Sequence, residues 1–240
     1  NNAMLPDLVA EERLGRWSGW AWGLGYLGGL TAMIIALFAF VQAETPMLGL
    51  DKESLEHIRI VGPLVAVWFL AFVWPMFMWT PDRVKSDVAI GQKISAGFAL
   101  LGKTLRELRH QGNILRFLIA RMIYADGLAT MFAFGGIYAA GTFGMELSEV
   151  ITFGIILNVT AGIGAICFAW IDDWIGSKKT IIIALTGLIG TAFGVIVVED
   201  ITWFWVWGSL LGIFVGPSQA ASRSLMARLA PGGQATEYFG

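Results

Sequence analysis

Two ionisable side chains, Arg121 and Asp126, lie inside a long apolar segment of this 240-residue sequence. A charge at the centre of a bilayer costs at least about 2.5 kcal/mol unless it is paired or hydrated, so charges at that depth are functional candidates by default. Counting about 1.5 Å per residue from Gly112, Asp126 is expected roughly 20 Å into a hydrocarbon core of about 30 Å. Such an acid can bind a solute or exchange a proton. The alternative is an acid that is protonated or hydrogen-bonded for purely structural reasons.

Three further residues extend or compete with this candidate site. Arg121 precedes Asp126 by five residues, about 140° around a helix, so it is expected either to join the site from another direction or to extend towards the cytoplasmic interface. Thr130 lies one turn beyond Asp126 and shares its face. Asn158, on the next apolar segment, is expected at a similar depth, where an amide serves either as a solute ligand or as an interhelical hydrogen bond.

Near the end of the sequence, Gln219, Ser222 and Arg223 share one helix face at the end of an apolar segment. This pattern is typical either of a gate or of an ordinary polar boundary. Metal or covalent chemistry is not indicated, because Cys167 is the one cysteine and the two histidines are far apart in the sequence. The sequence therefore predicts no metal, no cofactor and no enzymatic activity.

The composition explains which elements must position these side chains. Hydrophobic residues make up 56% of the chain and charged residues 14%, whereas a soluble domain carries about 25% charged residues. Helices need about 20 apolar residues to cross a bilayer. Six segments meet this requirement, at 17–41, 59–80, 113–141, 148–171, 180–198 and 201–222. The predicted fold is an all-α, polytopic transmembrane helix bundle.

Charge is distributed unevenly between the predicted loops. The segment 81–116 is rich in Lys and Arg, so it is expected on the cytoplasmic side, together with Lys178 and Lys179. Glu146 and Glu199 then fall on the outer side. We expect three parts: two helices in 1–80, a cytoplasmic linker with an amphipathic helix in 81–112, and four helices in 113–240. The small net charge of −2 gives no indication of a nucleic-acid partner.

A motif between the fourth and fifth apolar segments resembles a known family. The run from Ala169 to Lys179 is similar to the Gly-x-x-x-Asp-Arg-x-Gly-x-Arg-Arg loop of the major facilitator superfamily. Ala169 and Trp174 depart from this pattern. The matching positions are Asp173, Gly176, Lys178 and Lys179.

Other stretches narrow the resemblance to the bacterial branch related to the yeast autophagy-linked vacuolar amino-acid effluxer. They are Tyr124-Ala-Asp-Gly127, Phe134 to Gly144, Gln219-Ala-Ala-Ser-Arg-Ser-Leu225, and short segments at 2–8 and 231–240. The resemblance runs nearly end to end and adds Tyr124 to the candidate substrate or proton site. It implies a protein of twelve helices in two halves, of which this chain would be helices five to ten.

The same resemblance implies a secondary active transporter in the lipid bilayer, expected in the bacterial inner membrane. By analogy its cargo is a small solute such as an amino acid, moved by alternating access, with protons as the candidate coupling ion. The alternative is a membrane channel or structural helix bundle without coupled transport. Dependence of uptake on a proton gradient distinguishes the two.

Overall fold

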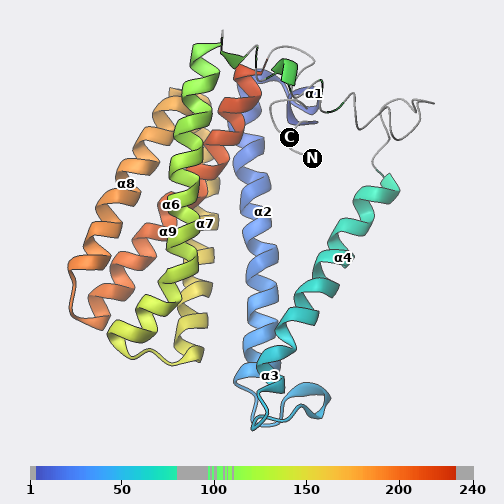
Figure 1. Ribbon diagram of the computed structural model, residues 1–240, viewed down its shortest axis with the longest axis vertical. Coiled ribbons are helices and arrows are strands. Elements are labelled where there is room, and N and C mark those ends of the chain that lie inside the picture. The colour runs from blue at the N-terminus through green and yellow to red at the C-terminus, as the bar shows by residue number, and fades with distance from the viewer. Residues whose placement is uncertain are drawn as a thin grey trace. The chain divides into compact units, whose positions relative to one another are not determined.

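The computed structural model is helical and describes residues 4–79, 111–230 and eight positions between 97 and 109. Within these residues it contains no strand, which confirms the predicted all-α class (Figure 1). Most of the predicted linker at 81–112, with its amphipathic helix, lies outside the described residues, as do the motif segments at 2–3 and 231–240. The division of the chain into three parts therefore stays a prediction.

The helices follow one another with short connections. They are α1 (Leu5–Leu8), a 3-10 turn (Glu11–Arg13), α2 (Leu14–Ile35), a π-helical turn (Ala36–Val41), a second 3-10 turn (Met47–Gly49), α3 (Glu56–Arg59), α4 (Val61–Trp79), α6 (Gly112–Phe143), α7 (Leu147–Ile175), α8 (Ser177–Val197) and α9 (Ile201–Leu229).

Six of the described helical segments are long and apolar enough to cross a membrane, as the sequence predicts. Their ends differ from the predicted ends. α7 continues to Ile175 and α9 to Leu229, beyond the predicted 171 and 222. The reason is that an apolar run marks the part of a helix that matches the hydrocarbon core, whereas backbone hydrogen bonding continues into the polar residues that follow. These polar last turns carry much of the candidate site.

The described residues group into two compact units, Ile35–Leu115 and a second unit that combines Asn1–Ile34 with Arg116–Gly240. In the first unit, α3 packs against the π-helical turn and the start of α4. In the second unit, α9 packs along both α7 and α8. Its core contains Leu128 of α6, Ala161 of α7, Leu188 of α8, and Leu211 and Val215 of α9.

The end of the bundle where α6 meets α7 and α8 meets α9 is closed by aromatic packing. Phe153 and Phe204 stack with their ring centroids 4.9 Å apart, and Phe143 lies 4.5 Å from Phe204. Asp200 caps α9 by accepting hydrogen bonds from the backbone N–H groups of Trp203 and Thr202. These bonds lower the pKa of Asp200, so its carboxylate favours the folded helix at neutral pH and loses this effect in strong acid.

Small residues let α9 approach α7 closely. The sequence predicts such a stripe from Gly208, Gly212 and Gly216, spaced four apart. A Cβ added at Gly216 would lie 2.1 Å from the Ala161 carbonyl oxygen, and one at Gly208 would lie 2.2 Å from the Phe153 ring. The backbone atoms of α7 cannot move aside as a flexible side chain would, so Gly216 sets the α7–α9 separation.

We predict that Gly216→Ala destabilises the protein by about 1–3 kcal/mol, because the new methyl group overpacks a contact with the α7 backbone. The matched control is Gly190→Ala, since a Cβ at Gly190 of α8 meets no atom within 4 Å. Thermal unfolding of the purified complete protein in detergent measures the effect. Equal melting temperatures for the two variants would contradict the close packing of α7 and α9.

Candidate functional site

The turn between α7 and α8 is built on a glycine. Gly176 has φ 88° and ψ 148°, a conformation that is essentially restricted to glycine. It ends α7 and directly precedes α8, so the two helices reverse direction with one residue between them. Gly176 thereby places Asp172 and Asp173, in the last turn of α7, close to Ser177 at the start of α8. Lys178 and Lys179 follow and are exposed.

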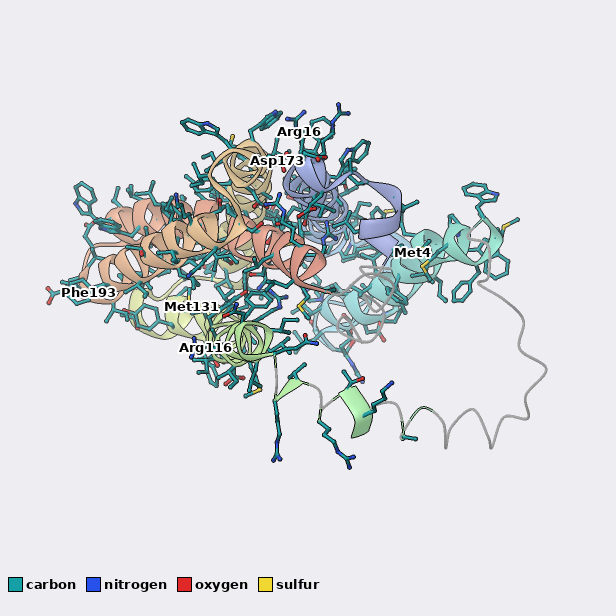
Figure 2. All side chains as sticks on the ribbon, turned by 90° about the horizontal axis from the view of Figure 1, so that it is seen from above. Met4, Arg16, Arg116, Met131, Asp173 and Phe193 are labelled. Carbon is teal, nitrogen blue, oxygen red and sulfur yellow. The ribbon has the colours of Figure 1, made fainter. Side chains whose placement is uncertain are left out.

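Asp173 binds the beginning of α2. Its carboxylate accepts hydrogen bonds from the backbone N–H groups of Gly15 at 2.9 Å and Arg16 at 3.2 Å. Arg16 Nε lies 3.5 Å from Asp173 Oδ2, and Arg228 Nη2 of α9 lies 3.4 Å from Oδ1. Figure 2 shows Arg16 and Asp173 beside each other. Free N–H groups at a helix N-terminus attract an anion, so Asp173 caps α2 from another helix.

Asp172 is a second, more deeply buried acid that the sequence analysis missed. Its side chain is 2% exposed and accepts a hydrogen bond from the Ser224 hydroxyl of α9. Ser177 Oγ lies 3.0 Å from Ser224 Oγ, and Arg228 Nη1 lies 4.0 Å from Asp172 Oδ1. The two adjacent acids therefore share the positive charge of Arg228.

We call this set of contacts the turn network. It consists of Asp172, Asp173, Ser177, Ser224, Arg228, Arg16 and the backbone N–H of Gly15. A Cβ at Gly15 would lie 2.7 Å from both carboxyl groups, so the network requires a small residue there. Two clues were present in the sequence, namely the adjacent acids beside the motif and the serine at 224.

Arg223 connects α9 to α2 at a second point. Its Nε donates a hydrogen bond to Ser18 Oγ at 2.9 Å and its Nη2 donates to the Ser18 carbonyl oxygen at 2.6 Å. Ser18 Oγ in turn donates to the Ala220 carbonyl oxygen at 2.7 Å. Ser18 is fully buried and the sequence analysis did not select it. The start of α2 is thus held by polar contacts from both α7 and α9.

Four residues that the sequence analysis placed in two separate groups lie together between α6 and α9. Arg121 Nη1 donates to the Tyr124 hydroxyl at 3.0 Å, and Nη2 donates to Gln219 Oε1 at 3.2 Å. The Tyr124 hydroxyl also shares a hydrogen bond with the Ser222 hydroxyl, which donates to the Ser218 carbonyl oxygen. We call Arg121, Tyr124, Gln219 and Ser222 the Arg121 cluster.

The other predicted residues do not join this cluster. Asp126 and Thr130 are exposed on α6. Asn158 donates to the Gly154 carbonyl oxygen at 2.9 Å and contacts Met33 Sδ of α2 at 3.4 Å. Among the described residues it makes no hydrogen bond to Asp126, so the predicted patch of Asp126 with Asn158 is not assembled. The roles of all three stay predictions.

Two further features limit the chemistry that the described residues can perform. A cavity of about 330 Å³ lies between the helices of the bundle, and its lining, which includes Thr130, Phe134, Tyr138, Phe153 and Phe204, is almost wholly apolar. The described residues contain no group of three His, Cys, Asp or Glu side chains that could hold a metal ion. The polar chemistry is therefore concentrated in the turn network, the Arg121 cluster and Asp126.

Comparison with known families fits this arrangement. Residues 6–240 match the family described as "Vacuole effluxer Atg22 like". The chain belongs to this family. With six apolar helices, it is part of a multi-pass membrane protein.

Its relatives are transporters and autophagy proteins of low sequence identity. An MFS-type transporter of Bacillus subtilis, YxiO, is 24% identical over all of this chain and 55% of its own length. Autophagy-related protein 22-1 of Aspergillus niger is 22% identical over 90% of this chain and 38% of its own length. The chain thus spans about half the length, or less, of these relatives. No solved structure matches it.

We predict that Asp173→Asn lowers the stability of the complete protein by about 1–3 kcal/mol, because Arg16 and Arg228 lose the charge of a largely buried carboxylate. Glu199→Gln is the control, since it removes the same charge from an exposed position in the α8–α9 turn. Thermal unfolding in detergent is the measurement. A melting temperature for Asp173→Asn equal to that of the control would mean that the turn network contributes no stability.

Proposed function

We propose that the complete protein is a secondary active transporter that moves a small solute by alternating access, with amino acids as the first class to test. The observation that carries this proposal is the turn network. It fastens the beginning of α2 to α7 and α9 through a capped N-terminus and ion pairs. Contacts of this kind can be exchanged for contacts with water when a gap opens between helices.

The family resemblance adds the meaning of this contact. It assigns α2 to the first half of a two-halved transporter and α6 to α9 to the second half. The turn network and the Arg223–Ser18 contact would then cross the interface that must open at one side of the membrane in each transport cycle. Lys178 and Lys179 would flank the opening from the cytoplasmic side.

Asp126 is proposed to line the solute or proton path. An exposed carboxylate on a membrane-spanning helix is costly against lipid, so it is best explained by contact with water or with another part of the complete protein. Thr130, one turn further along α6, extends the same polar surface. The relative in Bacillus subtilis supports a bacterial inner-membrane location for this protein.

We predict that the complete protein, reconstituted in liposomes, takes up labelled amino acids and that a pH gradient changes the rate of uptake. Transport coupled to protons requires this dependence, whereas a channel would only equilibrate the solute. The 240-residue chain alone is the control and is expected to be inactive, because the cavity between two halves needs both halves. Uptake that reaches equilibrium without responding to the gradient would instead support the channel alternative.

We predict that Asp126→Asn reduces uptake at least tenfold, or abolishes its pH dependence, at normal expression levels. The amide has nearly the same size as the acid and removes the charge and the exchangeable proton. Glu199→Gln again serves as the control for an exposed acid outside the helices. Full uptake with an unchanged pH profile in Asp126→Asn would show that this carboxyl group has only a structural role.

A further inference from the structure

Arg121 is a membrane-embedded cation with only neutral partners. Its guanidinium group binds the Tyr124 hydroxyl and the Gln219 side-chain oxygen, and it pairs with no carboxylate among the described residues. The nearest acid along α6, Asp126, lies five residues away and makes no ion pair with it there. Asp172 and Asp173 already bind Arg228 and Arg16. The positive charge of Arg121 is therefore uncompensated within the described part of the chain.

The neighbours of Arg121 hold it in place rather than neutralise it. Arginine has five N–H donors, of which two are used by Tyr124 and Gln219. The guanidinium carbon also lies 5.9 Å from the centroid of the Tyr124 ring. Tyr124 is fixed in turn by Ser222, a fully buried residue of α9. The side chain is thus directed across to α9 by two fixed hydrogen bonds, with donors left over.

We infer that the Arg121 cluster binds the carboxylate group of a small organic solute. A planar carboxylate matches the fork of a guanidinium group and forms two parallel charge-assisted hydrogen bonds with it. Its single negative charge also offsets the single positive charge of Arg121, which no described residue does. The hydroxyl groups of Tyr124 and Ser222 and the amide group of Gln219 add neutral donors for the same ligand.

The direction of the side chain favours this ligand over a lipid phosphate. An arginine that reaches for the headgroup region extends along its own helix towards the interface. Arg121 instead reaches across to Gln219, on a helix whose neighbouring positions Ser218, Ala220 and Ala221 are buried. The inference rests on the proposed transport function and specifies its substrate class as solutes with a free carboxylate.

The test measures binding directly and so does not depend on transport. The purified complete protein is unfolded thermally in detergent with L-leucine, L-valine or L-phenylalanine, and separately with 3-methylbutylamine, 2-methylpropylamine or 2-phenylethylamine. Each amine is the corresponding amino acid without its carboxylate. We expect at least one amino acid to raise the melting temperature, while its amine leaves the melting temperature unchanged.

Variants then locate the effect. Arg121→Gln should raise the dissociation constant about tenfold to a hundredfold, because the charge-assisted hydrogen bonds are lost. Arg121→Lys keeps the charge but not the fork and should weaken binding less, which provides a second variant if Arg121→Gln does not fold. The matched control is Arg116→Gln, an exposed arginine one and a half turns earlier on α6, which should bind as the unaltered protein does.

Three results would overturn the inference: no stabilisation by any of the three amino acids, equal stabilisation by the amines, or unchanged affinity in both Arg121 variants. Stabilisation by phosphatidylglycerol that depends on Arg121, without any effect of the amino acids, would identify a lipid site instead and also overturn it. Carboxylate binding without uptake in liposomes would contradict the proposed transport function but not this site. Uptake that is indifferent to Arg121 and to the carboxylate would contradict only the site.

Discussion

Two adjacent carboxylates at the end of one helix must be neutralised, and the surrounding structure is arranged to do so. Asp172 and Asp173 repel each other, and Asp172 is almost fully removed from solvent. A buried charge without partners costs several kcal/mol, so cations and N–H donors have to converge on this point. They come from three sources: Arg16 and the first backbone N–H groups of α2, Arg228 of α9, and the hydroxyl of Ser224. The relative positions of α2, α7 and α9 at this end follow from that requirement.

The same requirement explains the small residues nearby. Gly15 leaves room for the two carboxyl groups, and Gly19 of α2 faces Ala169 of α7 so closely that an added Cβ would lie 2.5 Å from the Ala169 Cβ. The alanine at 169, which departs from the glycine of the superfamily motif, is therefore tolerated because its partner is a glycine. Gly176, with its positive φ, completes the turn that presents the acids.

The six membrane-spanning helices could be predicted from the sequence because each depends on local composition alone, a run of about 20 apolar residues. The motif likewise pointed to Asp173 and Gly176. By contrast, Asp172, Ser18, Ser224 and Arg228 were missed, since helical periodicity says which residues share a face but not which helix that face meets. For the same reason Arg121 and Gln219, 98 positions apart, were assigned to different sites although they share a hydrogen bond.

One detail of α9 has a thermodynamic consequence. Gln219 and Arg223 are four residues apart and so lie on neighbouring turns of one helical surface, yet Gln219 binds Arg121 of α6 and Arg223 binds Ser18 of α2. A rotation or shift of α9 therefore alters both contacts together. Any ligand that binds more tightly to one arrangement of α9 must change the free energy of the α2 contact, and by linkage the α2 contact must change the affinity for the ligand by the same factor. One rigid helix thus couples occupancy on one side to closure on the other.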